Sequence, residues 1–154
     1  MNENKDIDIA VIESHMVKTK SLLMMCVANS ARSQMAEGLA KAMAPKKTEV
    51  FSAGSHPSHV NPFAVRALAV RGIASDTLFS KGLDEVPTDR IDYVITLCAE
   101  EVCPTFPGRD IQRFHWPLPD PAAVEGSDAE ILASFEAIRD ELEKRLEAFF
   151  ASDF

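Results

Sequence analysis

The sequence is poor in cysteine, with only three in 154 residues: Cys26, Cys98 and Cys103. An odd, small number of cysteines is not typical of a disulfide-stabilised secreted domain. No pair of histidines has the spacing of zinc ligands, so we expect no metal ion and no other cofactor. A secretory signal is absent, and so is an apolar run of the ~20 residues that cross a membrane. We therefore expect a cytoplasmic protein with no membrane partner.

Basic charge is also scarce, since 16 Lys and Arg residues face 24 Asp and Glu residues. The acidic excess falls in residues 120–154, which hold 3 basic and 10 acidic groups, whereas residues 1–119 hold 13 and 14. Non-specific nucleic-acid binding needs Lys and Arg to neutralise phosphates, so we expect no nucleic-acid partner. An anionic substrate would have to be held by a local site, because the overall charge does not attract it.

Apolar segments of strand length alternate with segments of helical periodicity. Strands are predicted over 21–26, 49–53, 91–97 and 110–116, and helices over 33–44, from 62 to about 72, and from 127 onward. Strands separated by helices pair in parallel through right-handed crossovers. The predicted fold class is therefore α/β: a small doubly wound parallel four-stranded sheet with helices on both faces. We expect residues 21–154 to form a single catalytic domain behind a polar N-terminal tail, residues 1–20.

Two helix starts carry specific capping residues. Asn61 precedes Pro62, which places a capping side chain before a proline at the first helical position. Ser127 and Glu130 have the spacing of a capping box. The helix after Ser127 is acidic on its polar face, and the simplest interpretation is a solvated surface.

Three chemically active side chains follow predicted strands. Cys26 ends the first strand, Cys98 follows the third, and Asp120 follows the fourth. In a doubly wound parallel sheet, ligands bind at the carboxyl ends of the strands. We therefore expect these three side chains to lie at one edge of the sheet, although they are far apart in the sequence.

The strongest motif is the loop that follows the first strand and leads into a helix. It places a cysteine, five residues, and then Arg32 and Ser33 in a row. Such a loop can surround a tetrahedral oxyanion with main-chain N–H groups, and the Arg32 fork suits two of its oxygens. The same positive environment lowers the pKa of Cys26, with Ser33 placed to bond the thiolate and Asn29 to brace the loop. The predicted oxyanion-binding residues are Val27, Ala28, Asn29, Ser30, Ala31 and Arg32.

Asp120 lies between Pro119 and Pro121, which restrict its backbone. Above an oxyanion cradle, its carboxylic acid could protonate a leaving oxygen. The alternative is an ordinary turn, since Asp-Pro is common in turns. Cys98 and Cys103 have two open interpretations as well: redox thiols, or buried thiols that fill space.

The loop and its following helix, CVANSARSQMAEGLA, resemble the low-molecular-weight protein tyrosine phosphatase superfamily. The segments SAGSHPSHVNPFAVRAL, DYVITLCAEEVCP and FHWPLPDPA more specifically resemble its arsenate reductase branch, the thiol-coupled ArsC type. The resemblance covers roughly residues 21 to 150. Ala31 and Gln34 in the loop, together with a single tyrosine in the chain, differ from the phosphatase branch and favour the reductase.

This resemblance implies a cysteine relay. Cys26 attacks arsenate, with phosphate or sulfate as its mimics, while Asp120 serves as the general acid. Cys98 then attacks Cys26 and releases arsenite, and Cys103 attacks Cys98. The final Cys98–Cys103 disulfide would be reduced by a thioredoxin-type or glutaredoxin-type partner.

Some reductases of this branch bind potassium beside the loop, through a carboxylate in the segment that matches Ser80-Lys81. The ammonium of Lys81 could stand where that ion lies, with Glu37, Ser52 and Asn29 as neighbours, or Lys81 could be a surface residue. Two other functions stay open. One is a low-molecular-weight phosphatase acting on phosphotyrosine or small phosphoesters, and the other is a non-catalytic oxyanion-binding or redox-sensing module.

Overall fold

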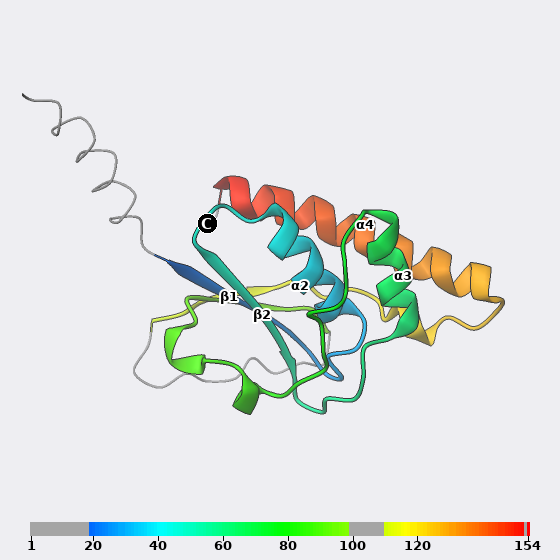
Figure 1. Cartoon of the computed structure of the whole chain (residues 1–154), viewed down its shortest axis with the longest axis horizontal. Coiled ribbons are helices and arrows are strands. Elements are labelled where there is room, and N and C mark those ends of the chain that lie inside the picture. The colour runs from blue at the N-terminus through cyan, green and yellow to red at the C-terminus, as the bar shows by residue number, and fades with distance from the viewer. Residues whose placement is uncertain (1–18, 99–109, 153) are drawn as a thin grey trace, which may run out of the picture.

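A computed structural model of the chain describes residues 19–98, 110–152 and 154. Its sheet has four parallel strands in the order β2-β1-β3-β4 (Figure 1). They are β1 (Lys20–Cys26), β2 (Thr48–Gly54), β3 (Tyr93–Thr96) and β4 (Gln112–His115). The chain leaves β1 for β2 on one side and reaches β3 on the other, so the strand order reverses at β1. Ligands bind at such a reversal in doubly wound sheets.

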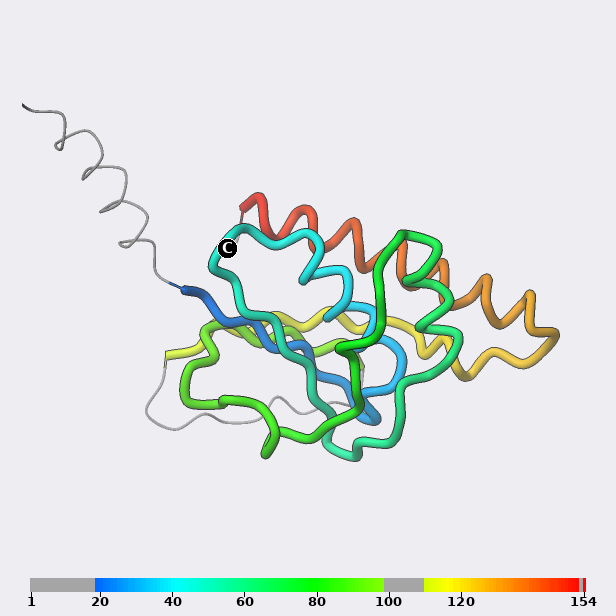
Figure 2. Tube along the Cα trace, viewed as in Figure 1, coloured from blue at the N-terminus to red at the C-terminus, as the bar shows by residue number. Residues whose placement is uncertain are grey.

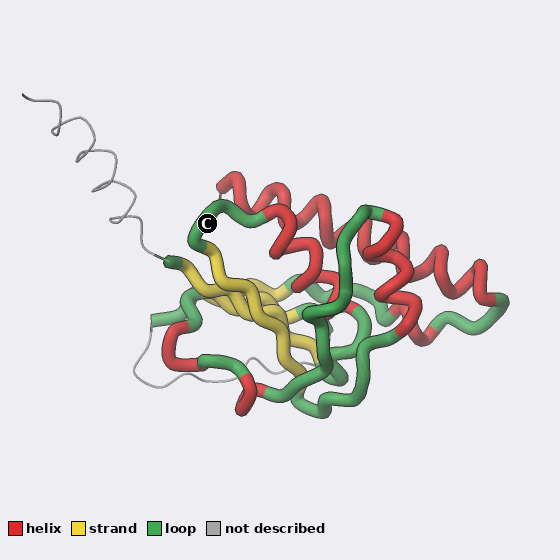
Figure 3. The backbone as a smooth tube through the Cα atoms, in the orientation of Figure 1, coloured by secondary structure: helices red, strands yellow, loops and turns green. Residues whose placement is uncertain are grey.

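Three α-helices lie together on one face of the sheet (Figure 3). They are α2 (Arg32–Met43), α3 (Pro62–Val70) and α4 (Asp128–Ser152). The opposite face is covered by the segment 83–91, which holds the short 3-10 helices η1 (Leu83–Glu85) and η2 (Thr88–Arg90) and buries Val86 and Ile91 against the sheet, together with Ile111. A third 3-10 helix, η3 (Pro121–Ala123), follows β4.

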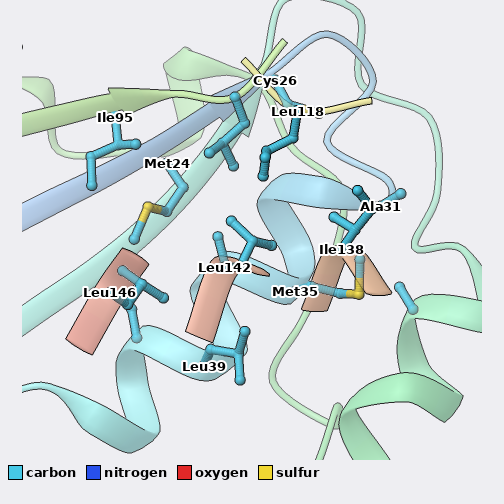
Figure 4. Packing of buried hydrophobic residues seen from close by; sticks show 14 of the residues in the cluster. Met24, Cys26, Ala31, Met35, Leu39, Ile95, Leu118, Ile138, Leu142 and Leu146 are labelled. Carbon is cyan, nitrogen blue, oxygen red and sulfur yellow. The ribbon is translucent and has the colours of Figure 1, made fainter. Parts of the chain in front are cut away.

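The two faces of the sheet are both buried, which explains why β1 is a continuous apolar run. Leu22 and Met24 point toward the α-helices, whereas Leu23 and Met25 point toward the 3-10 side. Figure 4 shows Met24 packed against side chains of the helices, with Cys26 at the end of the same cluster. The core therefore extends directly to the functional edge of the sheet and holds Cys26 in a fixed place.

The predicted fold class is confirmed, with one refinement: the described helices of the second face are 3-10 helices rather than α-helices. β3 and β4 are shorter than predicted. β4 is an edge strand with exposed residues, so the apolar pattern overstated its length. Both predicted caps form: Asn61 Oδ1 accepts the N–H of Phe63, and Ser127 and Glu130 exchange hydrogen bonds.

The N-terminal boundary differs by one residue from the prediction, because β1 begins at Lys20. Thr19 of the predicted tail is also described, whereas residues 1–18 lie outside the described residues. Within the described part of the chain, no helix is long and apolar enough to span a membrane.

Candidate active site

Residues 27–31 join β1 to α2 and form a loop whose carbonyl groups point outward. Figure 2 shows this loop next to the loop that follows β2. Three main-chain bonds tie them together: His56 N to Val27 O (2.8 Å), Ser58 N to Ala28 O (3.2 Å) and Asn61 N to Ser30 O (3.0 Å). In a planar trans peptide, the C=O and the N–H point in opposite directions. Outward carbonyls therefore turn N–H groups toward the inside of the loop, where they form an anion cradle.

Gly54, the last residue of β2, passes directly beneath this loop. A Cβ atom on Gly54 would lie 2.4 Å from Val27 O and 2.7 Å from Asn29 N, both main-chain atoms. Only glycine allows such a close approach of two backbones. The loop after β1 is thus shaped by a residue that lies more than 20 positions away in the sequence.

Cys26 is 3% exposed and ends β1 at the base of the cradle. Its pKa is lowered to about 5, mainly because the Cys98 thiol donates a hydrogen bond to its sulfur. Further bonds come from the Ser33 hydroxyl and from the main-chain N–H groups of Ser33 and Asn29, while burial opposes the shift. Cys26 is therefore a thiolate at neutral pH.

Cys98 is fully buried beside Cys26 and follows β3. Its sulfur accepts the N–H of Val27 at 3.3 Å. The pKa of Cys98 is raised, first because its thiol donates to the charged Cys26 sulfur and second because of burial. The pair therefore has an unequal charge distribution, with Cys26 ionised and Cys98 neutral.

Asn29 links the cradle to the thiolate through a directional chain of hydrogen bonds. Its Oδ1 accepts the main-chain N–H of Lys81 (2.9 Å), which fixes the orientation of the amide. Its Nδ2 then donates to Ser33 Oγ (2.8 Å) and Ser52 Oγ (2.9 Å). Because Ser33 accepts from Asn29, its single hydroxyl proton is directed to Cys26.

Lys81 is buried beneath the loop, 5% exposed, and its ammonium donates to Glu37 Oε1 (3.1 Å), Ser52 Oγ (3.3 Å) and Phe79 O (3.1 Å). The second carboxylate oxygen of Glu37 accepts from Lys41 at 2.7 Å. The structure thus brings Asn29, Glu37, Ser52 and Lys81 into one network. Lys81 is not a surface residue.

A cavity of about 240 Å³ opens above the cradle. Arg32 and Asp120 both line it, together with Cys26 and the loop. Arg32 Nη1 donates to Leu118 O (2.8 Å), whereas its buried Nε–H has no partner within the described residues. A buried donor without an acceptor is costly, and an oxyanion in the cavity would supply that acceptor.

Asp120 stands exposed at the rim of this cavity, where one carboxylate oxygen accepts the N–H of Ala122 (3.0 Å). Its second oxygen can face a bound ligand. The predicted gathering of Cys26, Cys98 and Asp120 at one edge is present in the structure. Cys103, the third predicted thiol, lies outside the described residues.

The sequence pattern of the low molecular weight phosphotyrosine protein phosphatase family matches residues 21–152. The chain belongs to this family. An arsenate reductase of Halalkalibacterium halodurans is 41% identical over 132 residues, or 84% of this chain and 94% of that protein. The resemblance inferred from the loop and the later segments is confirmed.

Two solved structures of family members superpose on most of the chain. One is described as an arsenate reductase in the phosphate binding state, with TM-score 0.71 and 32% identity over 86% of this chain and 98% of that one. The other is a thioredoxin-dependent arsenate reductase of Corynebacterium glutamicum, with TM-score 0.62 and 30% identity over 95% of this chain and 71% of that one.

Several supporting residues of this family member were missed by sequence reasoning. Gly54, Ser80 and Leu118 each touch the loop or Arg32. A glycine directly after a predicted strand is a signal of close backbone approach that could have identified Gly54. Ser80 and Leu118 act through hydrogen bonds to or from the main chain, which leave no pattern in a single sequence. Within the described residues, no cluster of three His, Cys, Asp or Glu side chains could hold a metal ion.

We expect Ser33→Ala to raise the pKa of Cys26 above its value of about 5. The variant loses the hydroxyl bond to the thiolate, and a hydrogen bond to a charged group contributes about 1.5–3 kcal/mol, or about 1 to 2 pKa units. Thiolate absorbance and alkylation rate against pH measure the shift. The variant should react more slowly near pH 6 and equally near pH 9. Ser127→Ala, at the capping box, is the matched control, and a Ser33→Ala titration that coincides with it would contradict this role.

Proposed function

We propose that this chain reduces arsenate to arsenite by a cysteine relay. The observation that carries the proposal is the Cys98 thiol in hydrogen-bond contact with the Cys26 thiolate inside an anion cradle. A phosphatase needs one nucleophilic thiol, whereas a reductase must supply two electrons, which thiols provide by forming a disulfide. The arsenate reductases among its relatives support the same reading.

Arsenate is a tetrahedral oxyanion, and phosphate and sulfate share its shape. Its oxygens would take the inward main-chain N–H groups of the loop that are not bonded to the Cys98 or Cys26 sulfur, and the unpaired Nε–H of Arg32. The Nη1 bond to Leu118 O leaves the Nε side of the guanidinium for the ligand. A phosphate-bound state of a related reductase is consistent with this placement.

In the first step, the Cys26 thiolate attacks arsenic and an S–As bond forms. One As–O bond breaks, and Asp120 donates the proton that lets the oxygen leave as water. Arsenic is still pentavalent in this thiol-arsenate adduct. The lowered pKa of Cys26 makes the attack possible without a separate base.

In the second step, Cys98 loses its proton and attacks the Cys26 sulfur. An S–S bond forms, the S–As electron pair passes to arsenic, and arsenite leaves with arsenic in the trivalent state. The electrostatics set this order, because the charged Cys26 raises the pKa of Cys98. Once Cys26 is bonded to arsenic its charge is gone, and Arg32 and the Val27 N–H then favour the Cys98 thiolate.

In the third step, Cys103 attacks Cys98 and frees Cys26 for another cycle. An external dithiol protein of the thioredoxin or glutaredoxin type then reduces the Cys98–Cys103 disulfide. The thioredoxin-dependent relative supports thioredoxin as the first reductant to test. Free thiols of this kind persist in the cytoplasm, which is the proposed location.

The test is a coupled assay in which the full-length protein, arsenate and a reductant system consume NADPH. A thioredoxin–thioredoxin reductase mixture and a glutathione–glutaredoxin mixture are compared at equal concentrations. The proposal expects arsenate-dependent turnover with at least one of them and arsenite as the product. No turnover with either mixture, while p-nitrophenyl phosphate is hydrolysed rapidly, would favour the phosphatase alternative. Neither activity, with a change in partner binding on oxidation, would favour a redox sensor.

We further propose that the Lys81 ammonium takes the place of a monovalent cation beneath the loop. Replacing Lys81 with methionine removes the buried cation beside the Glu37 carboxylate, which keeps only a neutral donor, Ser52 Oγ, and the half-exposed Lys41. We expect a loss of about 2 to 4 kcal/mol in the free energy of unfolding, measured by urea denaturation. Potassium should restore part of it to the variant and leave the natural protein unchanged.

The matched control is Lys41→Met, which removes the half-exposed partner of the same carboxylate and should cost less than about 1 kcal/mol. The double variant Lys81→Met with Glu37→Gln should recover most of the lost stability, since no unpaired charge is left. A Lys81→Met protein as stable as the natural one would contradict the role of the ion pair.

A further inference from the structure

One peptide of the cradle is held by a side chain rather than by the main chain. Four of the five loop carbonyls accept a main-chain N–H group, three from the segment 54–61 and one within α2. The carbonyl of Asn29 instead accepts Nε2 of Gln34 at 3.0 Å. Asn29 has a φ of 46°, a left-handed conformation that is uncommon outside glycine. The peptide that follows Asn29 therefore depends on Gln34 for its orientation.

Gln34 is fully buried at the start of α2, and its side-chain amide is oriented so that one of its polar atoms has no hydrogen-bond partner. Besides Asn29 O, Nε2 lies near Asn29 Oδ1 (2.9 Å) and Phe79 O (2.9 Å), so two N–H groups serve three oxygens. Its Oε1 is buried with no partner within the described residues. Turning the amide over would place Oε1 against three acceptors. The loop thus imposes an orientation that leaves one oxygen unsatisfied.

We propose that Gln34 is a positioning residue that aims the main-chain N–H of Ser30 into the oxyanion cradle. The C=O of Asn29 and the N–H of Ser30 belong to one planar peptide and point in opposite directions. The Gln34 amide pulls the carbonyl outward and so turns the N–H inward. This inference rests on the proposed oxyanion-binding function and deepens it.

Gln34→Met separates this role from a packing role. Phe79 O keeps the Lys81 ammonium (3.1 Å), and Asn29 Oδ1 keeps the Lys81 N–H (2.9 Å). Only Asn29 O loses its donor, and the unsatisfied Oε1 of Gln34 disappears in exchange. We therefore expect an unfolding midpoint close to that of the natural protein. The affinity for an oxyanion should fall about tenfold to a hundredfold, since one N–H bond to a charged ligand is lost.

The experiment is a titration of the full chain with inorganic sulfate, followed by calorimetry and by the main-chain amide signals in a ¹H–¹⁵N spectrum. Sulfate should shift the Ser30 and Ala31 signals of the natural protein, but only the Ala31 signal of Gln34→Met. Gln112→Met, on the exposed edge strand β4, changes the only other glutamine and should behave as the natural protein. A Gln34→Met protein with natural affinity and a shifted Ser30 signal would overturn the proposal. If the natural protein itself bound neither sulfate nor phosphate, the proposed function would fail first.

A second variant, Gln34→Glu, tests whether Gln34 positions the Ser30 N–H even if Gln34→Met does not fold. An ionised glutamate at position 34 can only accept hydrogen bonds and faces three oxygens, whereas the protonated acid can donate one. The sulfate affinity of Gln34→Glu, divided by that of the natural protein at the same pH, should therefore rise as the pH falls and the glutamate is protonated. The charged groups around the site, Cys26, Arg32, Glu37, Lys81 and Asp120, are present in both proteins, so the ratio removes the pH dependence that the two proteins share. A ratio that stays constant with pH would count against Gln34 as a positioning residue.

Discussion

Replacing Cys98 with serine is expected to abolish repeated reduction of arsenate, with a loss of roughly a thousandfold or more in kcat. The serine hydroxyl can still donate to the Cys26 thiolate, but it cannot form a disulfide. Cys26 stays ionised and the cradle stays intact, so hydrolysis of p-nitrophenyl phosphate should fall by no more than a few fold. Steady-state assays of both reactions on one preparation measure the contrast.

Cys103→Ser is the matched control, since it removes a thiol from a later step. It should still release one arsenite per protein molecule and then stop, whereas Cys98→Ser should release none. Sustained arsenate reduction by Cys98→Ser with a thioredoxin system would show that Cys98 is not the second thiol. Equal loss of both activities would instead indicate a damaged site.

Gly54→Ala is expected to displace the loop at residues 27–31, although Gly54 itself does not belong to the loop. The new methyl group would lie within 3 Å of two main-chain atoms of the loop, Val27 O and Asn29 N. Overpacking of this kind costs about 1–3 kcal/mol of stability. A displacement of the loop by about 1 Å can cost a hundredfold in rate. Both reactions of Cys26 should therefore fall by about that factor, and the pKa of Cys26 should rise, because the Asn29 N–H donates to its sulfur.

Gly72→Ala is the matched control for Gly54→Ala. Gly72 has a φ of 73° but no atom within 4 Å of its would-be Cβ, and it follows α3, away from the loop. It should lose about 1 kcal/mol through backbone strain and keep full activity. If Gly54→Ala kept the activity and the Cys26 pKa of the natural protein, the close approach of β2 would not shape the cradle.

The elements that could be predicted from the sequence are those set by local patterns. The apolar run of β1, the helical spacing in α2 and the caps at Asn61 and Ser127 each depend on neighbouring residues. The parallel topology then places the carboxyl ends of β1, β3 and β4 at one edge of the sheet. The proximity of Cys26 and Cys98 could therefore be predicted from the sequence.

The rest could not be predicted, because it depends on contacts with no residue preference. Main-chain N–H groups from the segment 54–61 orient the loop carbonyls, and almost any side chains could accompany them. Arg32 is anchored by the carbonyl of Leu118, a contact set by where β4 ends. The apolar pattern also could not tell the α-helical face of the sheet from the 3-10 face, since both bury their residues.

The transfer of electrons from two thiols to arsenic is tested most directly by a single turnover without reductant. The reduced protein receives one equivalent of arsenate, is alkylated, and is mapped by peptide mass spectrometry. The relay predicts a Cys98–Cys103 disulfide with Cys26 alkylated as a free thiol, and a Cys26–Cys98 disulfide in the Cys103→Ser variant. Arsenite release with all three thiols still free, or with Cys98 unlinked in both proteins, would contradict it.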